Sequence, residues 1–313
     1  MRVFITGATG FIGTHVVHRF VEAGWEVAAL VRRGANTGPL SGLTDRLTLV
    51  EGDLRQADSL TRSIVAINPS VCVHLAWYVG PGYLHAVDNF EAVAGTAALL
   101  GALSQSQCRK VVFVGSCAEY EPCAACLEDD SPIGPRTLYA ACKRAAWLMV
   151  EQIARLRGWS ALNPRLFNVY GPGEPEARLV PSVVRALLAG DRSPLTSGDQ
   201  MRDFLHVQDV ADALWAISSS DIEGPINVAS GIPTPAGDVA REIARQLGRP
   251  DLLDFGVLPQ AIGTPPWLCA RPGRLHTALG WTPRFSLASG LEQTIGWWRQ
   301  RIHDAGRLSA VSN

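Results

Sequence analysis

Three side chains in the first half of the chain have the types and spacing for acid–base chemistry at a carbonyl carbon. Ser116 follows a short apolar run, Lys110 to Val114, and Tyr139 and Lys143 lie four residues apart in a stretch of helical pattern. Residues at this spacing share one face of a helix. An ammonium beside a tyrosine favours the phenolate, so the phenol can exchange protons nearer to neutral pH. We therefore predict that Tyr139 protonates an alkoxide, Lys143 tunes it and Ser116 holds the oxygen.

A tyrosine and a lysine at this spacing are common on helix faces, so the prediction depends on the elements around them. Arg2 to Thr6 is predicted to form a buried strand, and Gly7, Gly10 and Gly13 follow it, ahead of an apolar helical pattern from Thr14. Such glycines let the backbone turn tightly and approach a pyrophosphate, which the N–H groups of the helix end attract. The segment predicts a dinucleotide site, and the alternative is a plain structural turn.

The end of the second predicted strand, Glu26 to Val31, bears on the choice of cofactor. A carboxylate at this point of a nucleotide-binding sheet binds the 2′-hydroxyl of NAD, whereas an arginine accommodates the 2′-phosphate of NADP. Here Arg32 and Arg33 follow the strand, and no carboxylate stands at its end. We therefore predict NADP(H) in preference to NAD(H). The alternative is a solvated arginine pair on a loop.

Strands alternate with helices through the first half of the chain, which predicts an α/β fold with a doubly wound parallel sheet of the Rossmann type. The alternation degrades later, where we expect a smaller, mixed α/β C-terminal substrate lobe. We expect residues 1–168 and 204–229 to form the NAD(P)-binding domain, and residues 169–203 and 230–313 to form the substrate lobe. Ser116 would then lie at the carboxyl edge of the sheet, where such sheets bind ligands.

Composition excludes several classes of partner. The 313 residues are 47% hydrophobic, which supports one large or two modest domains. With 28 basic and 29 acidic residues and no basic run, neither nucleic acid nor an anionic membrane is an expected partner. No apolar run is long enough to span a bilayer, and a strand near the first residue leaves no room for a signal peptide. Seven scattered cysteines fit reduced thiols in a cytoplasmic protein, and the Cys123 and Cys126 pair is expected to be structural rather than metal-binding.

Several motifs in order resemble the extended short-chain dehydrogenase/reductases, in the superfamily of nucleotide-sugar epimerases, dehydratases and reductases. The resemblance covers nearly the whole chain and is more specific for the superfamily than for the reaction. The motifs that carry it are Thr6-Gly-Ala-Thr-Gly-Phe-Ile-Gly13, Gly52-Asp53-Leu54, His74-Leu75-Ala76, Gly115-Ser116 ahead of Tyr120, Tyr139-x-x-x-Lys143, Asn168-Val-Tyr-Gly-Pro172, Arg202-Asp-Phe-Leu-His-Val207 and Arg271-Pro-Gly273.

The resemblance implies a nucleotide-diphosphate sugar as the substrate, a homodimer as the assembly, and sites for both cofactor and sugar. Together with the two arginines discussed above, the implied cofactor site consists of Gly7, Thr9, Gly10, Phe11, Ile12, Gly13, Arg32, Arg33, Asp53, Leu54, Leu75, Ala76, Trp77, Tyr139, Lys143 and Phe167. The implied substrate site consists of Ser116, Cys117, Asn168, Arg202 and Arg271, since guanidinium forks and an amide suit a diphosphate. Further candidates to line the pocket are Trp77, Tyr78, His85, Glu119 and the loop 173–180.

Departures from the family pattern bear on the reaction. Dehydratases of this superfamily carry an Asp-Glu pair directly after the catalytic Ser or Thr, where this chain has Cys117 and Ala118. The enzymes that make GDP-fucose use a cysteine and a histidine where Ala118 and Gly173 stand here. Both routes are therefore disfavoured. Ala92 replaces a family asparagine, for which Asn89 is a candidate substitute, and Glu119 replaces a family valine.

The segment from Gly115 to Tyr120 is nearer to the simple 4-ketoreductases of deoxysugar synthesis, such as GDP-rhamnose synthases. We therefore predict NADPH-dependent reduction of a nucleotide-diphosphate-linked 4-keto-(6-deoxy)hexose. The first alternative is an NAD-dependent nucleotide-sugar 4-epimerase, which shares the Ser, Tyr and Lys and lets the keto intermediate rotate before hydride returns. The arginine pair argues against it, because such epimerases usually retain NAD. The second alternative is a non-catalytic NADP-binding regulator.

Overall fold

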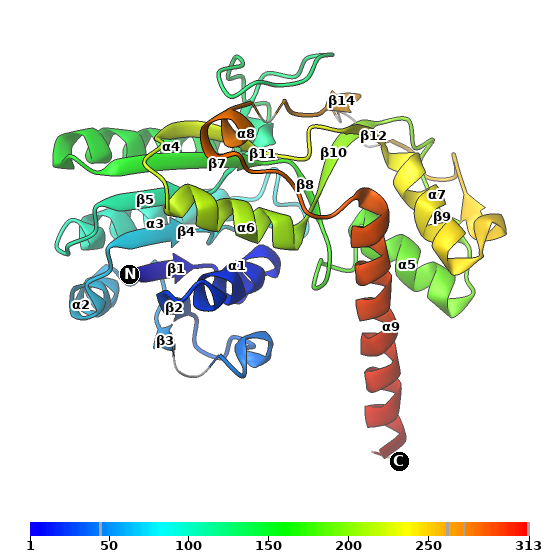
Figure 1. The fold of residues 1–313 in the computed structure, drawn as a ribbon, viewed down its shortest axis with the longest axis horizontal. Coiled ribbons are helices and arrows are strands. Elements are labelled where there is room, and N and C mark those ends of the chain that lie inside the picture. Colours follow the sequence, from blue (N-terminus) through cyan, green and yellow to red (C-terminus); the bar gives the residue numbers. More distant parts are fainter. Residues whose placement is uncertain (44–45, 261–262, 264, 272, 312–313) are drawn as a thin grey trace.

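A parallel sheet forms the larger part of the protein (Figure 1). The computed structural model describes residues 1–43, 46–260, 263, 265–271 and 273–311. In spatial order the strands of this sheet are β11 (Gly224–Val228), β7 (Ser160–Leu166), β5 (Lys110–Phe113), β4 (Val71–His74), β1 (Arg2–Thr6), β2 (Glu26–Val31) and β3 (Leu47–Glu51), and the short β6 (Gly115–Ser116) also pairs with β7. Their pairing is parallel throughout the described residues. The predicted doubly wound Rossmann sheet is confirmed.

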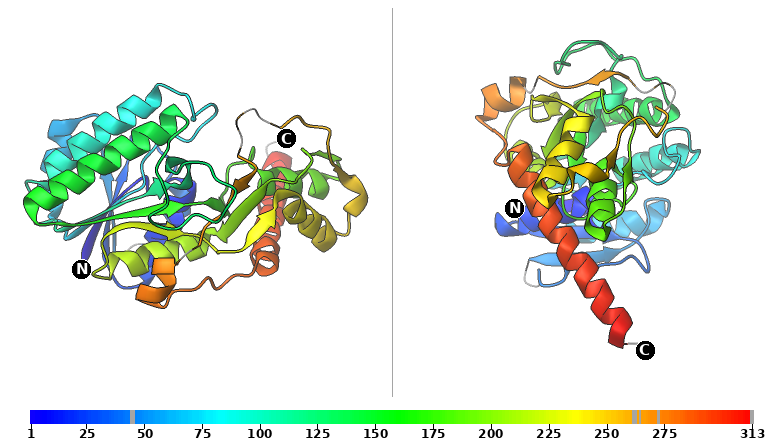
Figure 2. Two further views of the ribbon diagram at one scale, coloured as in Figure 1. Left: turned by 90° about the horizontal axis from the view of Figure 1, so that it is seen from above. Right: turned by 90° about the vertical axis from the view of Figure 1, so that its right-hand side faces the viewer.

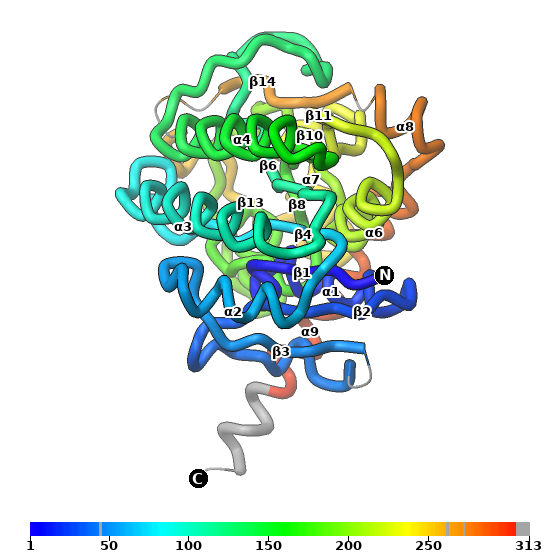
Figure 3. The backbone as a smooth tube through the Cα atoms, turned by 90° about the vertical axis from the view of Figure 1, so that its left-hand side faces the viewer, coloured from blue at the N-terminus to red at the C-terminus, as the bar shows by residue number. Residues whose placement is uncertain are grey.

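Helices cover both faces of this sheet, which explains why its central strands are apolar on both sides. The helices on one face are α1 (Phe11–Glu22) and α6 (Val207–Ser218), and those on the other are α2 (Ala57–Ile67), α3 (Asp88–Leu103) and α4 (Leu138–Arg157). Figure 3 shows α2, α3 and α4 on one side of the sheet and α6 on the other. Alternate residues of β1 face opposite clusters: Val3 and Ile5 join Phe20 of α1, whereas Phe4 joins Leu60 of α2.

A smaller lobe lies beside the sheet (Figure 2). Its central strand, β10 (Met201–His206), pairs in parallel with β8 (Asn168–Tyr170) and β14 (Trp267–Leu268) and antiparallel with β12 (Pro233–Pro235). Its other elements are α5 (Leu179–Ala189), β9 (Ser193–Pro194), α7 (Ala236–Leu247), β13 (Leu253–Asp254) and α9 (Leu287–Val311). Side chains of α5, α7 and α9, among them Val183, Ile243, Leu291 and Trp298, form a separate apolar core. The expected mixed C-terminal lobe is therefore present.

Three short 3₁₀ helices and one short α-helix complete the described elements. They are η1 (Gly38–Leu40), η2 (Cys117–Glu119), η3 (Pro250–Leu252) and α8 (Gly273–Leu279). Across the described ranges, every helix falls short of the length or the apolar character needed to cross a membrane.

Two buried carboxylates join segments that are far apart in the chain. Asp203 of β10 accepts hydrogen bonds from the backbone N–H groups of Ser230 and Gly231, at 2.7 and 2.9 Å. Asp209 of α6 accepts them from Arg284 and Phe285, at 3.0 and 3.1 Å. Hydrogen bonds to an ionised group are stronger than neutral ones, so these carboxylates fix the chain where it passes between the sheet and the smaller lobe.

The glycine turn differs from its prediction in one respect, because α1 begins at Phe11 rather than near Thr14. Gly13 therefore lies in the first turn of the helix. A Cβ on Gly13 would lie 2.0 Å from the carbonyl oxygen of Gly7. Helix and strand thus pack too closely at this point for any side chain, which is the physical reason for the third glycine.

We expect Gly13→Ala to lower the free energy of unfolding by about 1–3 kcal/mol or more, because the new methyl group collides with backbone that cannot move aside. Urea unfolding measures the change. The matched control is Gly101→Ala in α3, where a Cβ would meet nothing within 4 Å. There we expect no loss, and a gain of up to about 1 kcal/mol from the higher helix propensity of alanine. Equal losses at both positions would contradict the packing argument.

Candidate active site

The glycine turn lies where the order of strands reverses, between the carboxyl ends of β1 and β4. Gly7 has a φ of 72°, and a Cβ there would lie 2.7 Å from the backbone nitrogen of Ala76. The N–H of Gly10 donates to the Gly7 carbonyl at 3.0 Å, and α1 then begins at Phe11. A helix N-terminus behind a turn without side chains fits a dinucleotide diphosphate, because backbone N–H groups can approach the anion closely.

The glycine turn and the loop after β4 together form the cradle for the dinucleotide, and neutral His74 holds that loop in place. Its two ring nitrogens lie 2.6 Å from the Thr6 hydroxyl and 2.9 Å from the Thr96 hydroxyl. The Thr6 hydroxyl also accepts a hydrogen bond from the Ala76 N–H, at 3.2 Å. Burial lowers the pKa of His74 to about 3, so the imidazole is neutral at physiological pH. The histidine thereby fixes the loop after β4 against the glycine turn.

Ser116 and Tyr139 come together at the carboxyl edge of the sheet. Ser116 ends β6 and caps η2, and its hydroxyl accepts a hydrogen bond from the Ala118 N–H at 3.2 Å. Tyr139 lies in the first turn of α4, and its ring meets Tyr83 edge-on at 4.9 Å between centroids. Burial raises the pKa of Tyr139 well above its usual range, and a side-chain hydrogen bond with Ser116 opposes the rise. The serine is thus placed to share an oxygen with the phenol.

Lys143 is buried one turn further along α4, with 4% of its surface exposed. Its Nζ donates to the Val114 carbonyl at 2.8 Å and lies 4.1 Å from the centre of the Trp77 ring. Burial lowers the pKa of Lys143, and the charge of Glu119 opposes that shift. Burial is the largest cause of the raised pKa of Tyr139, and the Lys143 ammonium contacts the Val114 carbonyl and the Trp77 ring.

Asn89 secures the indole that faces Lys143. The Trp77 Nε1–H donates to Asn89 Oδ1 at 2.8 Å, and the Asn89 amide nitrogen donates to the carbonyls of Tyr83 and Ala86 at 2.7 and 2.8 Å. The side chain is fully buried. Asn89 therefore holds Trp77 and the loop that carries Tyr83.

The other residues of the predicted cofactor site lie around the same edge. Gly10 is exposed, Gly13 and Phe167 are buried, and the half-buried residues are Thr9, Phe11, Ile12, Asp53, Leu54, Leu75, Ala76 and Trp77. Asp53 is held by Arg55, whose guanidinium donates to it at 2.8 Å. Arg32 and Arg33 are exposed, and the charge of Arg32 reaches Asp53, whose pKa is lowered mainly by Arg55. The guanidinium of Arg32 thus lies near the carboxylate that the resemblance assigns to adenosine.

The residues predicted to hold a diphosphate sugar lie in two different settings. Asn168 has a buried amide nitrogen with no hydrogen-bond partner among the described residues. Arg202 is half-buried, donates to the carbonyls of Met201 and Pro265 at 2.7 and 2.9 Å, and lowers the pKa of buried Cys117, although burial raises that pKa overall. Arg271 is exposed and pairs with Glu128 at 3.0 Å, beside a shallow hollow of about 380 Å³. Cys117 is thus buried, Asn168 and Arg202 are half-buried, and Arg271 faces solvent.

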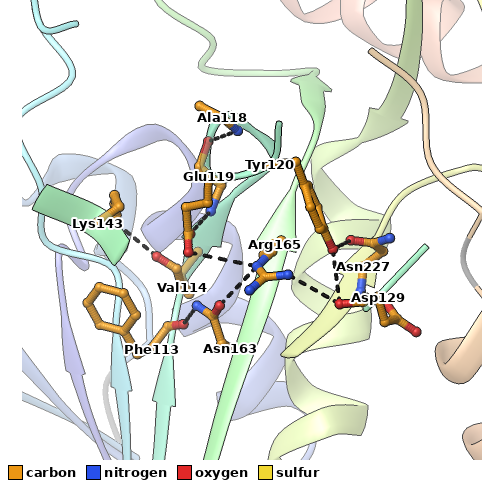
Figure 4. A network of polar contacts seen from close by, with 11 residues as sticks. Phe113, Val114, Ala118, Glu119, Tyr120, Asp129, Lys143, Asn163, Arg165 and Asn227 are labelled. Atoms are coloured by element: carbon orange, nitrogen blue, oxygen red, sulfur yellow. Dashed lines mark hydrogen bonds and ion pairs between the residues drawn. The ribbon is translucent and has the colours of Figure 1, made fainter. Parts of the chain in front are cut away.

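Glu119 is not a pocket-lining residue, contrary to the sequence-based expectation. Its side chain is fully buried and accepts a hydrogen bond from the Ser116 backbone N–H at 2.8 Å (Figure 4). It faces Arg165 and Asn163 of β7, two buried residues that the sequence analysis did not single out. They occupy alternate positions of an otherwise apolar strand. Their spacing of two residues was the signal in the sequence that could have paired them, because alternate residues of a strand point to the same face.

The fold and these contacts define a Rossmann-type dinucleotide-binding protein with a serine, a tyrosine and a lysine gathered beside the dinucleotide cradle. The model of the NAD dependent epimerase/dehydratase family matches residues 3–229, and the chain belongs to that family.

Two curated relatives and one solved structure illustrate the similarity. The chain is 30% identical to a UDP-glucose 4-epimerase of Mycolicibacterium smegmatis, over 96% of this chain and 99% of that protein. It is 29% identical to a dTDP-glucose 4,6-dehydratase of the same organism, over 96% and 93%. The crystal structure of a Thermus thermophilus UDP-glucose 4-epimerase in complex with NAD superposes with a TM-score of 0.85, at 25% identity over 96% and 99% of the two chains.

We expect Asn89→Ala to lower the free energy of unfolding by about 1–3 kcal/mol, because it leaves the buried Trp77 N–H without its acceptor. Chemical unfolding measures the loss, and tryptophan fluorescence of the folded variant should change as the indole loses its hydrogen bond. The control is Asn36→Ala, since Asn36 is exposed and accepts a single local hydrogen bond from Gly38. A loss no larger than that of the control would show that Asn89 does not secure Trp77.

Proposed function

We propose that the protein is a 4-epimerase of a nucleotide-diphosphate sugar. The observation that carries the proposal is the gathering of Ser116, Tyr139 and Lys143 beside the cradle, with Cys117 and Ala118 where dehydratases carry two carboxylates. With a nicotinamide to accept and return hydride, this set can take up and give back the proton of a carbinol, but it offers no acid–base pair for eliminating water. UDP-glucose 4-epimerases among the relatives support the same choice.

The predicted 4-ketoreductase has less support than its epimerase alternative. Its main argument was the arginine pair after β2, which concerns the cofactor and not the reaction at the sugar. None of the contacts around Ser116 distinguishes one-way reduction from oxidation followed by reduction. The relatives described above are epimerases and a dehydratase. We therefore place the epimerase first and retain the reductase as an outcome of the test.

A nicotinamide dinucleotide bound in the cradle would supply the acceptor and donor of hydride. Tyr139 would take the proton of the sugar 4-hydroxyl as carbon 4 loses hydride, and Ser116 would hold the oxygen that becomes the ketone. The keto sugar would then rotate in the site. Hydride would return to the opposite face of carbon 4, and Tyr139 would give the proton back. Burial raises the pKa of Tyr139, so its deprotonated form depends on positive charge nearby, which Lys143 provides if it remains protonated.

The smaller lobe, residues 169–203 and 230–313, would hold the nucleotide sugar. Asn168 and Arg202 are suited to its diphosphate, because one has an unused buried N–H and the other a half-buried guanidinium. Arg271 would first have to leave Glu128, from which it is separated by 3.0 Å. An exposed ion pair of this kind contributes little stability, so that exchange is inexpensive.

We expect the Tyr139→Phe variant to lose activity by about 10²–10⁴-fold, because it removes the proton-transferring hydroxyl. The assay is conversion of UDP-glucose to UDP-galactose, with other nucleotide sugars as a panel, followed at the sugar and at the nicotinamide absorbance. Tyr170→Phe is the control, since its hydroxyl bonds the Leu287 carbonyl in the core of the smaller lobe. Stoichiometric oxidation of NADPH by a 4-keto sugar, without epimerisation, would instead identify the reductase. If the wild type turned over no sugar, the non-catalytic NADP-binding regulator would be the remaining interpretation.

We further propose that Arg32 and Arg33 let the cradle accept NADP(H) as well as NAD(H). Both are exposed at the end of β2, and no carboxylate there would repel a 2′-phosphate. We expect Arg32→Asp to shift the ratio of NADP to NAD affinities toward NAD by roughly tenfold or more, as loss of a charge-assisted hydrogen bond implies. Titration of intrinsic fluorescence with each cofactor measures the ratio, with exposed Arg157→Asp on α4 as the control. An unchanged ratio would mean that the pair is merely solvated.

A further inference from the structure

A buried ion pair lies beneath Ser116, outside the residues to which the proposed mechanism gives a role (Figure 4). Glu119 is fully buried and Arg165 is 2% exposed, and their nearest charged atoms, Oε2 and Nε, are 3.7 Å apart. Burying two charges is costly unless they are well paired and hydrogen-bonded.

One oxygen of Glu119 determines the shape of the backbone at Ser116. Oε1 accepts the Ser116 N–H at 2.8 Å, while the Ser116 hydroxyl caps the same short helix, η2, through the Ala118 N–H. A Cβ on Gly115 would lie 2.7 Å from this oxygen. The carboxylate therefore packs directly against the two residues that deliver the serine hydroxyl to the site.

The other oxygen is incompletely compensated. Oε2 is buried and has no hydrogen-bond partner among the described residues. Arg165 is engaged elsewhere: its Nε donates to Asn163 Oδ1 at 3.2 Å, its Nη1 donates to the Asp129 carbonyl at 3.2 Å, and its guanidinium stacks 4.6 Å from the Tyr120 ring centre. Burial raises the pKa of Glu119, and the charges of Arg165, Lys143 and Arg144 oppose that rise, so the ionised form of this carboxylate depends on the cations around it.

Lys143 contacts the same backbone segment. Its ammonium donates to the carbonyl of Val114, two residues before the Ser116 N–H that Glu119 accepts. The charged groups that act on Glu119 are Arg165, Lys143 and Arg144, and the groups whose pKa it raises in turn are Cys117, Tyr120 and Tyr139. Burial lowers the pKa of Lys143, and Glu119 is the charge that opposes this.

We propose that Glu119 is a positioning residue, whose buried carboxylate fixes the Ser116 backbone and places a negative charge beside the strand end that Lys143 contacts. The activity test of this inference rests on the proposed function. Within the described part of the chain, the partners of the Lys143 ammonium are a carbonyl and two aromatic rings, and no carboxylate is hydrogen-bonded to it. Without Glu119 the lysine would therefore lose its proton at lower pH, and with it the charge that favours the Tyr139 phenolate.

The variant that tests this is Glu119→Gln, which keeps the oxygen that accepts the Ser116 N–H and removes only the charge. We expect the alkaline decline of kcat/KM to begin about one pH unit lower than in the wild type, as loss of a nearby opposite charge implies. The matched control is Asp129→Asn. Asp129 is also a buried carboxylate of this network, but its oxygens accept the backbone N–H groups of Asn227 and Arg274.

The result that supports the inference is an alkaline limb that moves in Glu119→Gln and stays in place in Asp129→Asn. A limb that is unmoved in Glu119→Gln, or that moves equally in both variants, would overturn it. If Glu119→Gln does not fold, Glu119→Val replaces it, because valine is the residue of the family pattern at this position. The same displacement is expected there, with an additional loss of kcat from the freed Ser116 backbone.

A stability measurement separates this inference from the proposed function. With Glu119 present, folded Lys143 keeps its proton to higher pH, so the folded wild type binds more protons than Glu119→Gln over that interval. The difference in unfolding free energy, wild type minus variant, must then decrease as pH rises through the interval. Inactivity of the wild type toward every sugar would defeat the proposed function alone, whereas a pH-independent difference would defeat the pairing of Glu119 with Lys143.

Discussion

The constraint on which the site depends is the burial of one ammonium, that of Lys143, at the carboxyl edge of the sheet. A charge in this position requires compensation, because burial disfavours the charged form. The protein supplies a carbonyl from Val114, an indole face from Trp77 and a carboxylate, Glu119, behind the strand end. Each of these depends on a further contact: the indole on Asn89, and the carboxylate on Arg165. The polar network around the serine is therefore best understood as the surroundings that a buried lysine demands.

Close packing of the backbone determines the shape of the cofactor cradle. Gly7 and Gly13 leave backbone against backbone where the first strand, the first helix and the loop after β4 meet. His74 stays neutral there and joins that loop to β1 through Thr6. A rigid cradle, and a lysine of α4 held against a neighbouring strand end, suit hydride transfer, since reacting atoms must be held close and aligned. The residues that follow Ser116 in this chain are Cys117 and Ala118, so no carboxylate pair stands directly after the serine.

The two lobes are coupled through backbone hydrogen bonds to carboxylates rather than through exposed ion pairs. Asp203 and Asp209 accept N–H groups from segments about twenty-five to eighty residues later in the chain, as their partners Ser230 and Phe285 show. Both lie on β10 and α6, consecutive elements that run from the smaller lobe onto the sheet. The proposed sugar-binding residues Asn168 and Arg202 lie at the start of that connection. Substrate and cofactor would therefore meet where the chain is most firmly fixed.

The sequence alone predicted the sheet, which the structure confirms, and it proposed the cradle and the reactive set of Ser116, Tyr139 and Lys143, because these predictions rest on local periodicity and fixed spacing. It did not reveal that α1 begins at Phe11, since the close approach of Gly13 to Gly7 involves two elements. It also misplaced Glu119, which a local pattern cannot assign to the pocket or to the interior. Only the tertiary structure decided that this carboxylate lies between Ser116 and Arg165, because its partner belongs to a strand more than forty residues away, brought alongside by parallel pairing with β6.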